Sequence, residues 1–284
     1  MARSMAMTTI KARYDASAER YRRWWEPVLA PSAMALLDHV GREPPAGAAP
    51  RILDLGTGAG LLALEAVRRW PTARVVGIDA SSGMLGVAAA EAEARLTSGE
   101  RARLELIAGD AGRLPFPDGS FDLALSSFVL QLVGDRSAAL RQVRRVLAPG
   151  GRFASVTWLV GDPDVRFAPD EAFEDALDEL DVDDEVEPEE ARSGDFASAR
   201  AAAAQLRRAG FRDVRAEALT LTHDYDPARY VDFLEEYAER ELFEELEADG
   251  RARLRQRTSA RLARLPIAAF RWRAPIVRTV ARRP

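Results

Sequence analysis

The sequence contains no cysteine and only two histidines, His39 and His223, among its 284 residues. Without cysteine there is no disulfide, no thiolate metal site and no cysteine nucleophile. Two histidines are too few for a histidine-rich metal cluster, so we predict no metal site. The sequence thus excludes the enzyme classes that depend on reactive sulfur or on a histidine-bound metal.

Long apolar runs are also missing from the chain. No segment approaches the roughly 18 consecutive apolar residues of a membrane span, and residues 1–10 lack the basic and then apolar profile of a signal peptide. We therefore expect a cytoplasmic protein without a membrane span. The net charge of −5 disfavours non-specific binding to nucleic acid, which depends on neutralising phosphates.

The composition is that of a soluble globular protein, with 47% hydrophobic and 30% charged residues. The length suits one large domain, or a domain with an embedded lid. Basic residues are almost all arginine, and Lys11 is the only lysine.

A glycine-rich turn follows the first expected strand, which is the apolar run 51–55. Gly56, Gly58 and Gly60 alternate after this strand, and a helical pattern begins at Leu61. A strand, a glycine turn and a helix N-terminus together bring bare backbone N–H groups up to a ligand. Glycine suits such a turn because it lacks a Cβ and accepts positive φ angles.

Three ligand classes use turns of this kind, and the spacing separates them. A P-loop needs Gly-Lys-Ser/Thr at its end, whereas Leu61 and Leu62 follow Gly60. A dinucleotide turn reads G-x-G-x-x-G, whereas this one reads G-x-G-x-G with Asp54 before the first glycine. The D-x-G-x-G-x-G pattern resembles motif I of class I S-adenosylmethionine-dependent methyltransferases. A dinucleotide site and a turn without a ligand are the alternatives.

Acidic residues follow the next two expected strands, 73–79 and 103–108. Asp79 can accept hydrogen bonds from both ribose hydroxyls of an adenosine, and its alternative role is to cap the helix that begins near Ser81. Asp110 can accept the adenine amino hydrogen or can be an ordinary turn aspartate. Met84, one turn into the following helix, is placed to contact the adenine face.

The motifs occur in the order of the class I methyltransferase series over about residues 10–160. They are Asp54 to Gly60, Asp79, Asp110, Phe121-Asp122 and Pro149-Gly150-Gly151, and the chain is most similar to the small-molecule branch that includes ubiquinone and menaquinone biosynthesis enzymes. The resemblance implies a Rossmann-like α/β fold with a seven-stranded, mostly parallel sheet, an antiparallel last strand, helices on both faces and a helical lid.

The resemblance also implies a cofactor, S-adenosyl-L-methionine, with S-adenosyl-L-homocysteine as its product. The glycines would border its methionine part, Asp54 would hold its amino group through water or a backbone relay, Asp79 would bind the ribose, and Asp110 with Ala111 the adenine. The full predicted cofactor set is Tyr14, Tyr21, Asp54, Gly56, Thr57, Gly58, Gly60, Asp79, Ala80, Met84, Asp110, Ala111, Ser126 and Ser127.

We divide the chain into an N-terminal helical cap (1–45), a cofactor-binding core (46–160), an acidic lid insertion (161–198) and the rest of the core (199–284), which carries a helical lid insertion at about 227–265. The alternative for the acidic segment is a solvated insertion. Tyr14 and Tyr21 either close over the cofactor or pack their segment on the sheet.

Two prolines and one serine set the expected boundaries of other elements. Pro27 is expected to end the first helix, and a second helix is expected to begin at Ser32. The last strand, 270–280, is expected at an edge of the sheet because it contains Pro275.

Methyl transfer is an in-line displacement that needs mainly the alignment of nucleophile, methyl carbon and sulfur. His223 is the candidate general base by residue type, with a structural histidine as the alternative. Gln131 stands where relatives often have histidine, and we place Gln131, Trp158 and Tyr225 on the substrate side. The D/N/S-P-P-Y/F block of base-methylating relatives is absent.

We therefore predict transfer of a methyl group to a small-molecule acceptor, with no nucleic acid partner and with a homodimer left open. The alternatives are an NAD(P)-dependent oxidoreductase, and a protein of the same fold that binds the cofactor without methylating.

Overall fold

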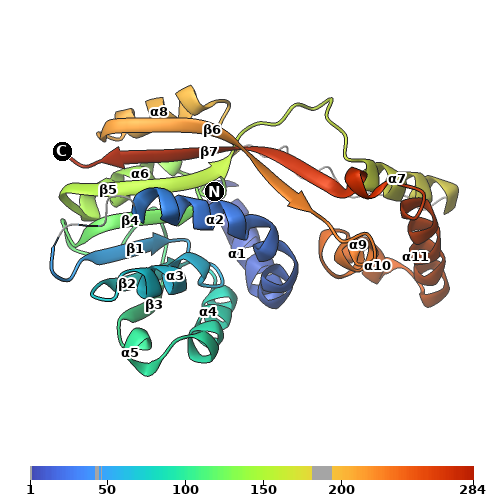
Figure 1. The fold of residues 1–284 in the computed structure, drawn as a ribbon, viewed down its shortest axis with the longest axis horizontal. Coiled ribbons are helices and arrows are strands. Elements are labelled where there is room, and N and C mark those ends of the chain that lie inside the picture. The colour runs from blue at the N-terminus through green and yellow to red at the C-terminus, as the bar shows by residue number, and fades with distance from the viewer. Residues whose placement is uncertain (1, 42–44, 46, 181–193) are drawn as a thin grey trace. The chain divides into compact units, whose positions relative to one another are not determined.

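The computed structural model describes residues 2–41, 45, 47–180 and 194–284. Its framework is a seven-stranded sheet with the order β3-β2-β1-β4-β5-β7-β6 (Figure 1). This arrangement confirms the predicted Rossmann-like α/β class. The strands are β1 (Arg51–Leu55), β2 (Arg74–Asp79), β3 (Leu104–Ala108), β4 (Phe121–Ser127), β5 (Leu147–Trp158), β6 (Arg212–Asp224) and β7 (Arg271–Arg282).

The first five strands are parallel where they pair, and β7 runs antiparallel to β5, as predicted for the last strand. The central strands are short apolar runs because helices cover both of their faces. The strand order reverses at β1: β2 and β3 lie on one side of β1, and β4 and β5 lie on the other. In open α/β sheets, ligands bind beyond the carboxyl ends of the strands at such a reversal.

The prediction that the last strand lies at an edge is wrong, because β7 lies between β5 and β6. Its pairing with β5 begins at Trp158 opposite Ile276, one residue beyond Pro275. Proline has no N–H, but Pro275 lies outside these pairs and contributes its carbonyl, which accepts a hydrogen bond from the Leu159 N–H at 3.0 Å. A proline is compatible with an inner strand where only its carbonyl is needed.

The N-terminal helices are continuous, so the prediction that Pro27 ends the first helix and that a second begins at Ser32 is wrong. Helix α1 (Ala2–Arg20) leads through a π-helical turn, η1 (Tyr21–Trp25), into α2 (Glu26–Gly41). Pro27 is the second residue of α2 and directly follows the π-helical turn, so the helix passes through this proline rather than ending at it. The wide turn before it is closed by the Glu26 N–H, which donates to the Tyr21 carbonyl.

Helices lie on both sides of the sheet (Figure 1). Leu140 and Leu206 lie on two different helices and belong to the same buried core. This core also contains Leu53 of β1 and Phe153 of β5, so the two helices cover the same face of the sheet. The helices that follow α2 in the core of the fold are α3 (Leu61–Arg69), α4 (Ser82–Arg95), α5 (Ser98–Arg101), α6 (Arg136–Val146), which carries Leu140, and α8 (Ala199–Arg208), which carries Leu206.

The chain divides into two compact units. The core unit comprises residues 1–160, 193–219 and 275–284, and the second unit comprises residues 161–192 and 220–274. The acidic segment 181–193 predicted as part of a lid lies outside the described residues. The second unit contains α7 (Ala168–Leu180), α9 (Tyr230–Phe233), η2 (Leu234–Ala238), α10 (Arg240–Glu245), α11 (Ala248–Leu262) and η3 (Ile267–Phe270).

The second unit has its own core, in which aromatic side chains pack and charged ones pair. Phe173 of α7 stacks on Phe243 of α10 with ring centroids 6.0 Å apart. Arg261 of α11 donates to Asp175 and Glu179 of α7, each at 2.5 Å. Within the described part of the chain, no helix combines the length and apolar character needed to cross a membrane.

Candidate functional site

The glycine turn is held against the end of β2. Gly56, Gly58 and Gly60 have φ angles of 68°, 55° and 92°, in the left-handed region that favours glycine. The N–H groups of Gly56 and Thr57 both donate to the Ile78 carbonyl, at 2.8 and 3.0 Å. The glycine turn after β1 therefore lies directly against the carboxyl end of β2.

Two of these glycines differ in what surrounds them. A Cβ on Gly56 would lie 2.3 Å from Cγ2 of Val129, so this glycine allows the turn after β4 to approach. A Cβ on Gly58 would have no atom within 4 Å. Gly58 thus presents bare backbone to open space, which is what a ligand needs in order to come close.

Asp79 closes β2 with its carboxylate fixed by backbone groups. The Gly58 N–H donates to Oδ2 at 2.8 Å, and the Ser81 N–H donates to Oδ1 at 2.9 Å. The cap of α4 is supplied by Ser81, whose Oγ accepts from the Met84 N–H at 3.1 Å, so Asp79 is not needed as the capping side chain. Each carboxylate oxygen accepts more than one hydrogen bond, so Asp79 keeps the capacity to bind a pair of hydroxyls.

Asp54 is buried below the turn, with 1% of its surface exposed. The Thr57 hydroxyl donates to Oδ2 at 2.7 Å. The other oxygen, Oδ1, has no well-formed hydrogen bond within the described residues, although the nearby Ala63 N–H slightly favours the charged form. Burial, with the charge of Asp79, raises the pKa of Asp54 to about 7.

Helix α1 brings the two predicted tyrosines to the same place. Tyr14 and Tyr21 pack against a buried cluster that includes Ala59 of the glycine turn and Met84 of α4. Their rings meet edge to face, with centroids 5.9 Å apart. The structure therefore brings Tyr14, Tyr21 and Met84 together beside the turn.

Sequence reasoning missed Asp15, which fastens α1 to α4. Its Oδ1 accepts hydrogen bonds from the Ser81 hydroxyl at 2.7 Å and from the Gly83 N–H at 2.9 Å. These partners are 66 and 68 residues away in the chain. No local sequence pattern could have indicated this contact, because nothing near Asp15 specifies what α1 packs on.

Asp110 and Ala111 follow β3, and Ala80 follows β2. The Asp110 side chain is exposed, and its Oδ1 accepts from the Gly112 N–H at 2.7 Å, which is the turn geometry considered as its alternative role. Ala80 is also exposed. The adenine contacts of these residues stay predictions.

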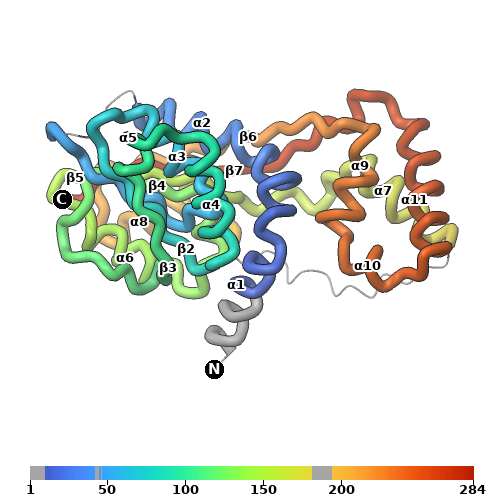
Figure 2. Tube along the Cα trace, turned by 90° about the horizontal axis from the view of Figure 1, so that it is seen from below, coloured from blue at the N-terminus to red at the C-terminus, as the bar shows by residue number. Residues whose placement is uncertain are grey.

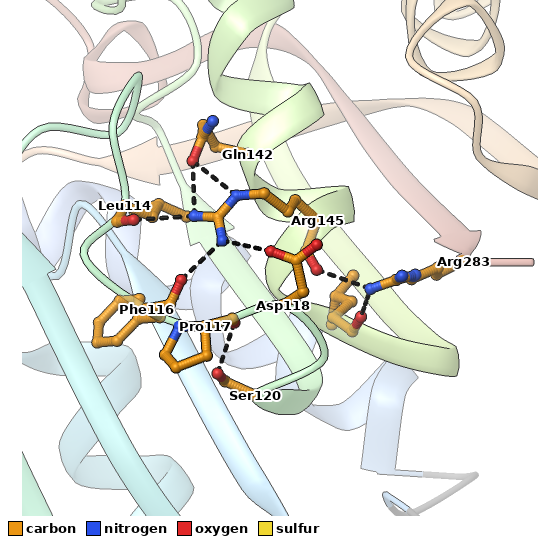
Figure 3. Close-up of polar contacts among 9 residues, drawn as sticks. Leu114, Phe116, Pro117, Asp118, Ser120, Gln142, Arg145 and Arg283 are labelled. Atoms are coloured by element: carbon orange, nitrogen blue, oxygen red, sulfur yellow. Dashed lines mark hydrogen bonds and ion pairs between the residues drawn. The ribbon is translucent and has the colours of Figure 1, made fainter.

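The loop after Ala111 is held by Arg145 of α6 (Figure 3). The guanidinium donates to the carbonyls of Leu114 and Phe116 at 2.9 and 2.7 Å, and to Asp118 Oδ1 at 2.8 Å. Gln142, one turn earlier on α6, orients the same guanidinium by accepting from Nη2 at 2.8 Å. The loop therefore has a defined position beside β3, although it lacks secondary structure of its own.

The ends of β4 and β5 bring two predicted substrate-side residues together around Phe128. Phe128 has a φ of 54°, which is rare for a side chain of this size and often marks a functional position. Its ring packs on Trp158 with centroids 4.4 Å apart, and its carbonyl accepts from Gln131 Nε2 at 2.6 Å. The Thr157 hydroxyl in turn donates to Gln131 Oε1.

Ser126 and Ser127 end β4 in different surroundings. The Ser126 hydroxyl is fully buried and donates to the Leu55 carbonyl at 3.2 Å, so it links β4 to β1. Ser127 is half-buried. Their predicted cofactor contacts stay predictions.

His223 and Tyr225 belong to the second unit. Their rings meet edge to face, 4.6 Å between centroids, and burial lowers the pKa of His223 below its usual value. Burial therefore favours the neutral imidazole, which is the form that a general base uses. Its catalytic role and the substrate role of Tyr225 stay predictions.

The core unit fits the predicted cofactor on three observations. Open space lies beside Gly58, the carboxylate of Asp79 keeps accepting capacity beside it, and Asp54 carries a buried oxygen without a well-formed hydrogen bond. Together they suit a ligand that offers a hydroxyl pair and a cationic amino group.

Comparisons with known proteins find similarity to methyltransferases. Residues 53–155 match the family model described as a methyltransferase domain. Demethylmenaquinone methyltransferase of Thermus thermophilus is 46% identical over 102 residues, which are 36% of this chain and 44% of that protein. Malonyl-[acyl-carrier protein] O-methyltransferase of Geobacter sulfurreducens is 36% identical over 143 residues, 50% of this chain and 48% of that protein.

A solved structure shares the fold over most of the chain. It is the Haemonchus contortus phosphoethanolamine N-methyltransferase 2 in complex with phosphomonomethylethanolamine and S-adenosylhomocysteine, with a TM-score of 0.57 and 20% identity, covering 95% of this chain and 57% of that one. The chain spans less than half the length of the two curated relatives.

Proposed function

We propose, from the premise that residues 53–155 match the methyltransferase domain family, that this protein transfers a methyl group from S-adenosylmethionine to a small-molecule acceptor. The predicted family and cofactor agree with the domain match and with the curated relatives, which are methyltransferases by name. The names of those relatives, a quinone precursor enzyme and an acyl-carrier protein enzyme, are the support for an acceptor other than nucleic acid.

The observation that carries the proposal is the carboxylate of Asp79. It stands at the end of β2, fixed by the N–H groups of Gly58 and Ser81, directly beside the open space at Gly58. A preset carboxylate binds a ribose diol without first having to be ordered, and this lowers the cost of binding.

In this proposal, the residues of the core unit bind the cofactor and orient it. Asp79 holds the ribose, Asp54 attracts the amino group of the methionine part, and the Gly56–Gly60 turn approaches it with bare backbone. S-adenosylmethionine supplies, when bound, an electrophilic methyl carbon whose leaving group is a neutral thioether. The work left to the protein is then alignment and the exclusion of water.

The test is calorimetric titration with S-adenosylhomocysteine and S-adenosylmethionine. We expect the wild type to bind both, and Gly58→Arg and Asp79→Ala each to lose at least about 30-fold in affinity, equivalent to about 2 kcal/mol. Gly86→Ala is the matched control, because a Cβ at this helical glycine meets no atom within 4 Å, and its affinity should equal that of the wild type.

Two results would overturn the proposal. Full affinity in both site variants would remove the site assignment. Binding of NADH without any binding of S-adenosylmethionine would replace the methyltransferase by an oxidoreductase. Turnover is then measured as S-adenosylhomocysteine release with panels of phenol, amine and carboxylate acceptors.

A further inference from the structure

The carboxylate of Asp15 joins helix α1 to the N-terminus of α4. Figure 2 shows α1 running beside α4. Asp15 Oδ1 accepts from the Ser81 hydroxyl, from the Gly83 N–H and, at 3.3 Å, from the Ser82 hydroxyl. Its other oxygen, Oδ2, pairs with Lys11 one turn earlier on α1. A negative charge at this position also suits the positive end of the α4 dipole.

The backbone of α4 is shaped for this contact. A Cβ on Gly83 would lie 2.6 Å from the Asp15 carbonyl oxygen and 2.9 Å from its Cα. Only glycine therefore allows the backbones of α1 and α4 to approach this closely. The approach places Ala18 in the buried cluster with Ala59 and Met84.

Ser81 connects Asp15 to the ribose carboxylate. Its N–H donates to Asp79 Oδ1 at 2.9 Å, while its hydroxyl donates to Asp15 Oδ1 at 2.7 Å. One residue therefore holds both acids through different groups. A movement of Asp15 away from α4 would release one of the contacts that hold Ser81 in front of Asp79, and would leave the hydrogen bond that the Ser81 hydroxyl accepts from the Met84 N–H.

We propose that Asp15 is a positioning residue that acts through Ser81, so that docking of α1 and binding of the cofactor reinforce each other. The proposal rests on the proposed function, because it assigns the ribose to Asp79. Coupling between two such events is reciprocal: if docked α1 raises the affinity for the cofactor, the cofactor stabilises docked α1 by the same factor.

The sequence provides a direct reporter of docking. Lys11 is the only lysine in the chain, so an endoproteinase specific for lysine cleaves this protein at one position, one turn before Asp15. A helix that is docked resists cleavage, and an undocked one is open to it. The rate of this single cut therefore measures the population of undocked α1.

The experiment measures this rate and the affinity for S-adenosylhomocysteine in five proteins. They are the wild type, Asp15→Ala, Asp15→Asn, Ser81→Ala and the control Glu19→Ala, which removes an exposed acid from the same helix. We expect S-adenosylhomocysteine to slow the cut in the wild type and in Glu19→Ala. We expect Asp15→Ala to lose about tenfold in affinity and to lose this protection.

Two variants separate positioning from simple damage to the fold. Asp15→Asn keeps an oxygen that can accept from Ser81 and Gly83, so it should restore most of the protection. Ser81→Ala leaves the sequence around Lys11 unchanged, so its loss of protection cannot come from altered recognition by the protease. The unliganded thermal midpoints of all five proteins serve as the check on folding.

The outcomes distinguish this proposal from the proposed function. If the wild type binds the cofactor, and Asp15→Ala and Ser81→Ala bind and are protected as the wild type is, the positioning role is wrong while the proposed function stands. If the wild type binds no S-adenosylmethionine or S-adenosylhomocysteine, the proposed function falls, and the coupling falls with it.

Discussion

At the residue scale, Asp54 shows how burial sets an ionisation that a motif cannot specify. Its pKa is raised to about 7, whereas an unfolded aspartate titrates near 3.9. Between these values the folded chain retains a proton that the unfolded chain has lost. The contribution of Asp54 to stability is therefore complete below about pH 4 and is lost as the pH rises towards 7.

We predict that this ionisation makes cofactor binding depend on pH. A cationic amino group placed beside Asp54 favours the ionised carboxylate, so binding should release a proton where the free carboxyl is still protonated. We expect S-adenosylhomocysteine to bind about tenfold more tightly at pH 8 than at pH 6. Titration calorimetry in buffers of different ionisation enthalpy measures both the affinity and the proton released.

Asp54→Asn is the decisive variant for this prediction, because the amide keeps the shape but cannot ionise. It should bind more weakly at pH 8 and with little dependence on pH. An unchanged pH dependence in Asp54→Asn would assign the proton to another group.

The sequence could predict which residues gather at the turn, but not what holds them. Asp54, Asp79 and the glycines are readable because backbone approach and diol binding need these residue types at fixed spacing. Asp15 and the left-handed Phe128 were not readable, since the first depends on partners distant in the chain and the second on a backbone angle that phenylalanine does not favour.

At the scale of elements, Arg145 fastens the loop 112–120 to α6 through its hydrogen bonds to Leu114, Phe116 and Asp118. We predict that Arg145→Ala lowers the free energy of unfolding by about 2 kcal/mol, since carbonyls and a carboxylate lose a charged donor. It should also weaken S-adenosylhomocysteine binding about threefold to fivefold, because the loop begins next to Asp110 and Ala111. Urea unfolding and calorimetric titration measure the two effects.

Arg141→Ala is the matched control, because Arg141 is an exposed arginine on the same helix. It should leave stability and affinity close to those of the wild type. If Arg145→Ala lost stability with no change in affinity, the loop would have no part in the adenine side of the site.

Element types were predictable from apolar spacing, whereas two proline boundaries were not. Pro27 and Pro275 each carry a general rule about a missing N–H. The rule does not decide the structure at these positions, because Pro27 directly follows a π-helical turn inside a continuous helix and Pro275 lies one residue outside its ladder with β5. Whether an N–H is needed depends on tertiary pairing, which a local pattern does not contain.

At the scale of the whole molecule, the chain passes twice from the core unit into the second unit and back. All the contacts described around Gly58, Asp79 and Asp15 lie within the core unit. The packing of α7 on α11 through Arg261 lies within the second unit. Separate cores of this kind open with separate free energies.

We therefore predict that the cofactor alone protects only the core unit from hydrogen exchange. Addition of S-adenosylhomocysteine should slow exchange in α1, the glycine turn and the start of α4, and leave α7 and α11 unchanged.

Arg261→Ala should speed exchange in α7 and α11 about fivefold, for a loss of about 1 kcal/mol from its ion pairs, with no change in cofactor affinity. The control Arg257→Ala, at an exposed position of α11, should leave exchange unaltered. Protection of α7 or α11 by S-adenosylhomocysteine would contradict this prediction.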